Sequence, residues 1–342
     1  MTHAKHPPIG QAQRASASPP ARGLLSRFGL AIVQWREASI LLAGVALVIY
    51  FQFTSSAFLS WNNIGVLSQF ATAAAIIAAG EVMVLICGEL DLSVGQVYAL
   101  TPFVMYFAEQ AGLPLGIAIV LGMLAAALVG LVNGLITVGL GVSSFVTTLG
   151  MLFFINGLTL SFSGGFPVQP EAGELWTAIL GGNVFITIAW AIGIALVFQF
   201  ILNKTRWGLH TIATGGNPHG AAEIGIRTGR IKIGNFMLCS MLGGVAGILD
   251  AFRIGSIDPL AGGTEIMFMA IASAVIGGTL LTGGSGTVIG ALLGAVVLAI
   301  LKDGFTISGV SAYTFDMILG IAIVMTMIMN VHLSRLRAGG KG

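Results

Sequence analysis

The sequence predicts an all-α fold: a polytopic bundle of about ten helices that spans a membrane. Two observations on composition predict it, because 56% of the 342 residues are hydrophobic and only 8% are charged. A soluble domain carries roughly 25% charged residues, and a soluble fold cannot hide so much apolar area from water. A third observation is that the apolar runs are rich in Ala, Gly and Leu and lack the alternation of barrel strands. The chain is therefore expected to be an integral membrane protein in contact with the lipid bilayer.

Long stretches without Asp, Glu, Lys or Arg mark the expected spans. A spanning helix needs about 20 mostly apolar residues, and the longer stretches hold two spans with a polar turn between them. The third and eighth candidates are short enough to be re-entrant or tilted, which leaves the count open. The ten candidates are 38–56, 64–87, 93–108, 116–138, 145–162, 183–203, 234–252, 266–281, 287–302 and 313–331.

The basic residues predict the orientation. All Lys and Arg residues except Arg253 and Lys302 lie before the first span, within 204–233, or after the last span. Cytoplasmic loops collect Lys and Arg, and an even number of spans separates these three regions, so both termini and the loop are expected in the cytoplasm. The expected parts are a disordered cytoplasmic tail (1–36), a transmembrane domain (37–333) and a cytoplasmic C-terminal tail (334–342).

The loop 204–233 contains a predicted short helix. Asn217 can cap free N–H groups and Pro218 suits the first helical position, while Gly225 suits a left-handed C-terminal cap. Only about two turns lie between them, too few to be stable alone in water. Two interpretations stay open: the helix rests on the membrane or its own bundle, or it docks into a partner subunit with Glu223 at the rim of the contact.

The segment GELDLSVG at 88–95 places two carboxylates between apolar runs. Ionisable groups at membrane depth are costly and usually face a cavity or a partner, and broken helix ends can build a substrate site. The alternative is a cytoplasmic turn with Glu89 and Asp91 both in water. A role for Asp91 as an N-cap of the next helix is compatible with either depth.

Other polar and small residues within the spans suggest packing. Asp250 and Arg253, three residues apart, predict a helical ion pair at the end of a span. Glu81 lies deep in the second span with no partner nearby in sequence. Glycine and alanine recur every four residues in 122–134 and 286–294, which predicts close helix packing within one chain or along a homodimer seam.

The motifs of an enzyme are missing from the sequence. Gly278–Ser285 has the spacing of a phosphate-binding loop, but Gly284 stands where that loop requires Lys. The histidines lie in the tails or the 204–233 loop, and no cluster has metal-ligand spacing. Cys87 and Cys239 lie in apolar segments and are expected as buried hydrophobic residues. We expect no catalytic residue, no metal and no cofactor in this chain, and the net charge of +2 does not indicate nucleic-acid binding.

Four segments together resemble a known family. GELDLSVG is similar to the G-G-I-D-L-S-V-G signature of ribose-type permeases in ATP-binding-cassette importers. Three further segments resemble that family in order: VSSFVTTLGMLFFINGLTL at 142–160, IATGGNPHGAAEIGI at 212–226 and AIASAVIGGTLLTGGSGTVIGALLGA at 270–295. The resemblance covers about 38–330.

The resemblance implies a permease subunit that imports a monosaccharide or related small polar solute across a bacterial inner membrane. It implies a permease dimer, most simply two copies of this chain, with cytoplasmic ATP-binding subunits that use the ATP. It also implies a periplasmic substrate-binding protein. Departures from the family pattern are Glu89 in place of Gly, Ser144 in place of Pro, and Pro218-His219 in the loop.

Two sets of site residues follow by position. The resemblance places the contact with the ATP-binding subunit in the loop, at Asn217, Ala221, Gly225 and Ile226, and we expect Ala222 and Glu223 of the same short helix to take part in it. Because sugars favour Asn, Asp, Ser and aromatic contacts, we expect the substrate pathway to involve Glu89, Asp91, Ser93, Phe145 and Asn156.

Other functions stay open at this point. The rival mechanism is a secondary transporter driven by a proton gradient, with Glu81 and Asp91 as its proton sites. Within the same family the cargo could instead be a polyol, a furanose-like signalling molecule or a branched-chain amino acid.

Overall fold

The computed structural model describes residues 36–171 and 173–311, and then 314, 317–321, 324, 325 and 328. Within these residues the chain is helical, and its one β-contact is the isolated bridge between Val168 and Ile257. The all-α prediction is confirmed. The tails and most of the tenth expected span, 313–331, lie outside the described residues. The helices are α2 Arg36–Thr54, α3 Trp61–Ile86, α4 Val94–Gln110, α5 Leu115–Gly139, α6 Ser144–Ser163, α7 Glu174–Leu180, α8 Val184–Lys204, α9 Arg206–Gly216, α10 Pro218–Glu223, α11 Thr228–Ile254, α12 Gly263–Ile276 and α13 Val288–Ile307.

The predicted count of ten spans is not confirmed. In the described part of the chain seven helices are long and apolar enough to cross a membrane: α2, α3, α5, α6, α8, α11 and α13. The third and eighth expected spans correspond to the shorter helices α4 and α12, of 17 and 14 residues. Each of these two helices adjoins a non-helical segment, 87–93 before α4 and 277–287 after α12. The break before α4 agrees with the gap expected between 87 and 93, whereas 277–281, expected at the end of the eighth span, is a loop.

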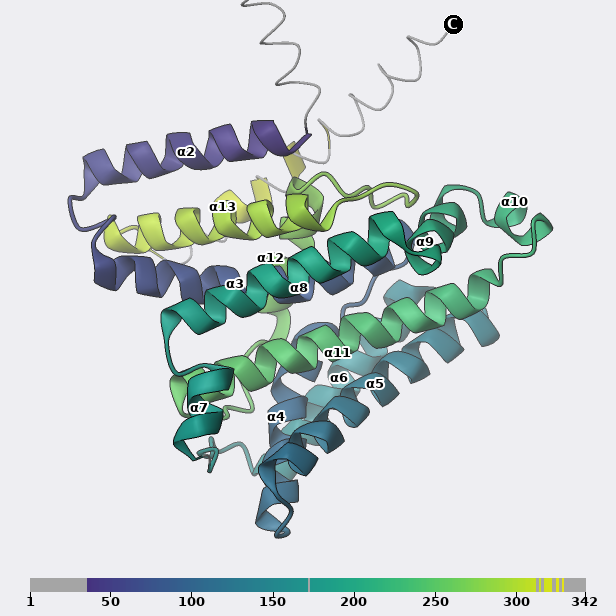
Figure 1. Ribbon diagram of the computed structural model, residues 1–342, viewed down its shortest axis with the longest axis horizontal. Helices are drawn as coiled ribbons and strands as arrows, with labels where there is room; N and C mark the ends of the chain where they lie inside the picture. The colour runs from purple at the N-terminus through teal and green to yellow at the C-terminus, as the bar shows by residue number, and fades with distance from the viewer. Residues whose placement is uncertain are drawn as a thin grey trace, which may run out of the picture.

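Helix α3 forms the centre of the bundle. It packs against α8, α11, α12 and α13, while α11 also packs against α4 and α5. From Thr72 to Ile86 every residue of α3 is buried. Figure 1 shows the long helices crossing the molecule side by side, with α9 and α10 at one end and α7 at the opposite end.

The glycine repeats pack helices of the same chain against each other. A Cβ on Gly130 of α5 would lie 2.6 Å from the Cα of Met237 of α11, and one on Gly134 would lie 2.7 Å from the Cα of Ile233. Likewise a Cβ on Gly294 of α13 would overlap the carbonyl of Ser273 on α12. These glycines contact helices of the same chain. At these positions the repeats therefore serve packing within one chain and not a homodimer seam.

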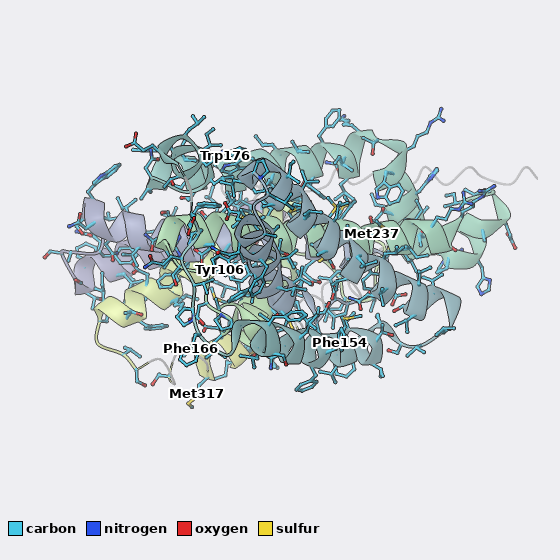
Figure 2. The ribbon with its side chains drawn as sticks, turned by 90° about the horizontal axis from the view of Figure 1, so that it is seen from below. Tyr106, Phe154, Phe166, Trp176, Met237 and Met317 are labelled. Atoms are coloured by element: carbon cyan, nitrogen blue, oxygen red, sulfur yellow. The ribbon has the colours of Figure 1, made fainter. Side chains whose placement is uncertain are left out.

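The outer surface of the bundle is apolar, as a bilayer requires. Large hydrophobic side chains on α5, α6 and α8 are exposed, and Phe154 of α6 is 63% exposed. Figure 2 shows Phe154 and Phe166 at the edge of the molecule. In water such a surface would be strongly unfavourable, whereas in lipid it contacts hydrocarbon.

Candidate functional site

Helix α10 has the capping structure that its sequence predicts. The side chain of Asn217 accepts a hydrogen bond from the Gly220 N–H at 3.0 Å, and Pro218 occupies the first helical position. Gly225 follows the helix with φ +88°, in the left-handed region that favours glycine. Along α10 only Ala221 is buried, and Ile224 just beyond the helix is 77% exposed. The helix therefore projects from the end of the bundle (Figure 1) with most of its surface open.

Helix α9 connects α10 to the core. At its end, Gly215 lies so close to the carbonyl of Ile86, the last residue of α3, that a Cβ there would overlap the oxygen. The N–H of Gly284, in the loop before α13, donates to the same Ile86 carbonyl at 2.8 Å. The ends of α9 and α3 and the 277–287 loop thus meet at one point. A movement of α9 would therefore displace the end of α3 and this loop.

A polar network around Asn235 of α11 reinforces this junction. The indole N–H of Trp207 on α9 donates to the Asn235 side-chain oxygen at 2.8 Å. The Asn235 Nδ2 lies 3.1 Å from the Thr211 hydroxyl, 3.1 Å from the Cys87 thiol and 3.2 Å from the Met83 carbonyl. One buried amide therefore joins α9, α11 and the end of α3.

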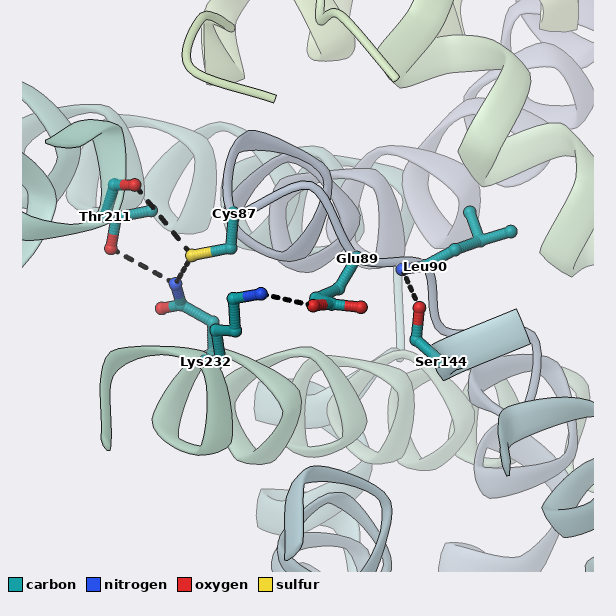
Figure 3. A network of polar contacts seen from close by, with 7 residues as sticks. Cys87, Glu89, Leu90, Ser144, Thr211 and Lys232 are labelled. Carbon is teal, nitrogen blue, oxygen red and sulfur yellow. Dashed lines mark hydrogen bonds and ion pairs between the residues drawn. The ribbon is translucent and has the colours of Figure 1, made fainter. Parts of the chain in front are cut away.

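Glu89 forms an ion pair with Lys232. The Lys232 Nζ lies 2.5 Å from Glu89 Oε1, and the side chains are only 23% and 13% exposed, respectively. Figure 3 shows this pair beside Cys87 and Thr211, with Leu90 and Ser144 on the other side. The sequence assigned Lys232 to the cytoplasmic loop, but it lies in the second turn of α11. Helix α11 therefore begins earlier than the composition suggested.

Asp91 is fully buried in a cluster of hydrogen-bond donors. Its Oδ1 accepts from the Ser93 N–H at 2.9 Å and the Ser93 hydroxyl at 2.6 Å, with the Asn133 amide at 3.5 Å. Its Oδ2 lies 3.4 Å from the Ser240 hydroxyl. The alternative with both acids in water is wrong, because Asp91 and Ser93 have no exposed surface.

The 88–93 loop runs alongside α11 into the bundle. Glu89 pairs with Lys232, Asp91 contacts Ser240, and Val94 packs on Gly243. From Lys232 to Gly243 the helix rises by about 16 Å at 1.5 Å per residue. The loop together with the first residue of α4 therefore extends over a distance that is about half the thickness of a bilayer core.

The other two expected pathway residues lie on α6. The side chain of Phe145 is 53% exposed in the first turn of the helix. Asn156 is half-buried, about three turns further along. The Ser144 hydroxyl accepts from the Leu90 N–H at 3.3 Å, so the start of α6 touches the 88–93 loop. The structure brings Glu89, Asp91 and Ser93 together but does not place Phe145 or Asn156 in the Asp91 cluster.

Comparison with known proteins matches the chain to a family of transport proteins. Residues 62–327 match the family model described as branched-chain amino acid transport system / permease component. The chain belongs to this permease family. The match includes the 88–95 segment, the α9–α10 region and the 277–287 loop.

Relatives of this permease are named as import permeases for xylose/arabinose, ribose and autoinducer 2. It is 37% identical to the xylose/arabinose import permease protein XylH of Sulfolobus acidocaldarius, over 90% of this chain and 88% of the relative. It is 33% identical to the ribose import permease protein RbsC of Escherichia coli K12, over 86% of this chain and 92% of the relative. It is 32% identical to the autoinducer 2 import system permease protein LsrC of Salmonella typhi, over 87% of this chain and 86% of the relative. The resemblance to ribose-type permeases is confirmed. No solved structure gave a significant match.

The permease has a second cluster of polar residues, which could not be recognised as one cluster from the sequence. At the end of the bundle opposite α10, the predicted ion pair between Asp250 and Arg253 is present. The Tyr98 hydroxyl of α4 also donates to Asp250, and Lys302 of α13 pairs with Glu265 of α12. These residues border a cavity of about 190 Å³. In the sequence, only the spacing of Asp250 and Arg253 linked two of these residues, and nothing linked them to Tyr98, Glu265 or Lys302.

Glu81 and the two cysteines lie in the core. The Cys239 thiol donates to Glu81 Oε1 at 3.6 Å, and both cysteines are free and buried. The other oxygen of Glu81, which is fully buried, has no hydrogen-bond partner within the described residues. This carboxyl group is the feature on which a proton-coupled mechanism would depend.

Proposed function

We propose that this permease imports a monosaccharide or a closely related small polar solute, and that separate cytoplasmic ATP-binding subunits drive it. The relatives that match over most of their length carry xylose/arabinose, ribose or autoinducer 2 in their names. The family description instead names branched-chain amino acids. Two of these three relatives are named for sugars and none is named for an amino acid, which favours the sugar.

The observation that carries the proposal is the exposed helix α10. A helix of six residues is not stable alone, and this one is held by the Asn217 cap and by its contacts with α9 and α11, with Ala221 buried. Its remaining surface is open, with the apolar side chain of Ile224 projecting. Such a surface fits a groove on a partner protein. The contact residues are Asn217, Ala221, Ala222, Glu223, Gly225 and Ile226.

The contacts beneath α10 supply a route for the movement. Pushing α10 displaces α9, whose Gly215 rests on Ile86 and whose Trp207 holds Asn235. Ile86 immediately precedes the loop that carries Glu89 and Asp91. A shift at the junction would therefore reach the loop without passing through flexible chain.

We assign the 88–93 loop to the inner side of the substrate pathway. The pair between Glu89 and Lys232 and the cluster around Asp91 and Ser93 tie this loop to α11. Alternating access then requires that the loop and α11 separate when the inner side opens. Phe145 and Asn156, on the helix that touches Leu90 through Ser144, are the further pathway residues in this proposal.

The remaining parts of the assembly follow from the same proposal. A periplasmic binding protein delivers the solute to the end of the bundle opposite α10, and two copies of this chain form the translocator. The protein lies in the bacterial inner membrane with both termini and the 204–233 loop in the cytoplasm. It spans 37–333 as one permease domain without an ATPase of its own.

Reconstitution tests the proposal. The permease, its ATP-binding subunits and its binding protein are placed in proteoliposomes, and uptake of labelled xylose, arabinose, ribose and leucine is measured. We expect ATP-dependent sugar uptake that disappears when the ATP-binding subunit carries an inactivated catalytic site. Uptake that persists with the inactive subunit contradicts the proposal.

The buried Glu81 supports a second candidate, the proton-coupled transporter. In the same liposomes a proton gradient without ATP would then drive uptake, and Glu81→Gln would abolish it. We expect neither effect, because the exposed α10 has no role in that mechanism.

A further inference from the structure

A cavity lies at the end of the bundle opposite α10, where five helices converge. Its volume is about 190 Å³, below the roughly 300–1,000 Å³ typical of sites for drug-sized ligands. That size suits one small solute. It is lined by Gln69, Phe70 and Ala73 of α3, Tyr98 of α4, Asp250 and Arg253 of α11, Gly262, Glu265, Ile266 and Met269 at α12, and Lys302 of α13.

The charges in the cavity are already paired. Asp250 accepts hydrogen bonds from the Tyr98 hydroxyl and from Arg253, whose Nε lies 2.7 Å from Asp250 Oδ1. Lys302 pairs with Glu265 and also lies 4.5 Å above the ring of Phe70. Two positive and two negative groups leave no net charge. The lining therefore favours a neutral ligand over an anion or a cation.

These groups keep hydrogen-bonding capacity for such a ligand. A carboxylate offers about four acceptor positions, a guanidinium five N–H groups and an ammonium three, more than the internal pairs use. Gln69 adds an amide to the same wall. A sugar hydroxyl both donates and accepts, so it fits a wall of mixed donors and acceptors. A free amino acid would instead need an unpaired cation and an unpaired anion.

The cavity extends from an exposed rim to a buried floor. The Glu265 side chain is 63% exposed at the rim, whereas Tyr98 and Met269 are each only 4% exposed. A second cavity of about 150 Å³ is also lined by Tyr98 and Asp250. Asp250 thus lines both cavities, and its carboxylate is held in place by Tyr98 and Arg253. A group fixed in this way can select among ligands by the direction of their hydroxyls.

We propose that this cavity is a binding site for one monosaccharide on the side where solute enters, and that Asp250 and Arg253 select among sugars. The inference rests on the proposed function and goes further, since it locates a specificity site in the permease itself. The binding protein is then a first filter and this cavity a second one.

Cysteine protection tests whether sugar occupies the cavity. The native cysteines are buried, so a membrane-impermeant thiol reagent reports on an introduced one. Ala73→Cys and Ile266→Cys place a thiol in the lining, and Ala57→Cys places one at the same end outside it. At a sugar concentration twice Kd, labelling in the lining should slow about threefold, as 1 + [L]/Kd. Labelling of Ala57→Cys should not change.

Protection by leucine but not by xylose, arabinose or ribose would overturn the sugar assignment. Equal labelling rates at every soluble sugar concentration would also overturn it.

Uptake ratios in the assembled importer provide the second test. Asp250→Asn and Arg253→Gln should change the ratio of xylose to ribose uptake several-fold, while Glu174→Gln, on exposed α7, should leave it unchanged. A purely structural defect would lower the uptake of all sugars by the same factor, and that result contradicts the proposal. If the unmodified importer carries none of these sugars, the proposed function itself fails.

Discussion

Lys232 and Glu89 lie 143 positions apart in the sequence, yet Lys232 Nζ is 2.5 Å from Glu89 Oε1. The pair ties the loop after α3 to the second turn of α11. Figure 3 shows the pair beside Cys87, at the end of α3, and Thr211 of α9. The ion pair holds together two elements that separate in the transport cycle proposed above.

Removing one partner of this pair should be more harmful than exchanging both. In Lys232→Met the Glu89 carboxylate loses its partner while mostly buried, and we expect a loss of about 1–3 kcal/mol in stability. The double exchange Glu89→Lys with Lys232→Glu should recover at least half of that loss. Thermal unfolding of the purified permease measures both, and equal losses in the single and double variants would show that the pair contributes nothing.

Gly225→Val should uncouple the transporter without preventing insertion. The φ of +88° at Gly225 is strained for a branched residue, which costs about 1–2 kcal/mol, and the strain falls on the end of α10. We expect sugar uptake per ATP hydrolysed to drop several-fold. Gly112→Val is the matched control, because Gly112 has φ +86° at a turn remote from α10 and open space around it. Equal coupling in the two variants would argue against the α10 assignment.

Gly215→Ala should disrupt the junction, whereas its neighbour Gly216→Ala should not. The new Cβ at 215 would overlap the Ile86 carbonyl oxygen, while one at 216 would be 3.8 Å from its nearest neighbour, the Gly284 Cα. We expect a lower melting temperature and weaker coupling only at 215. Overpacking of this kind typically costs about 1–3 kcal/mol. If both variants behave like the unmodified protein, α9 does not rest on α3 as described.

Asp91→Ala and Asp91→Asn should differ in stability. Alanine leaves the hydroxyl and the backbone N–H of Ser93 without their buried acceptor, at a cost of about 1–3 kcal/mol. Asparagine keeps one oxygen for these donors, and its amide can donate to the Ser240 hydroxyl, so we expect near-normal stability and uptake. Loss of uptake in a stable Asp91→Asn permease would show that transport needs the charge itself.

Much of the fold could be predicted from residue pattern. Charge-free apolar runs located the long helices, because lipid forces backbone groups to bond within each segment. Local signals were equally reliable: the Asn217 cap, the Gly225 turn and the pair of Asp250 with Arg253 each depend on residues a few positions apart. The short helices α4 and α12 were less predictable, since an apolar run does not reveal where a buried chain leaves the helix.

Contacts between segments that are distant in the sequence could not be predicted from the residue pattern. Glu89 was expected either in water or at a substrate, and its partner Lys232 was counted as part of a loop. The cavity around Tyr98, Asp250 and Lys302 collects residues from five helices. No spacing in the sequence links these residues.

By itself the sequence determined that this protein is a helical membrane protein, which family it resembles, and where the short helix α10 begins and ends. These properties depend on hydrophobicity and on hydrogen bonds between near neighbours along the chain. Only the tertiary structure decided that Asp91 is buried, that Glu89 meets Lys232, and that a neutral polar cavity lies opposite α10. The physical reason is that the partner of a buried charge is set by which helices pack together, and glycine contacts between the described helices bring them into that packing.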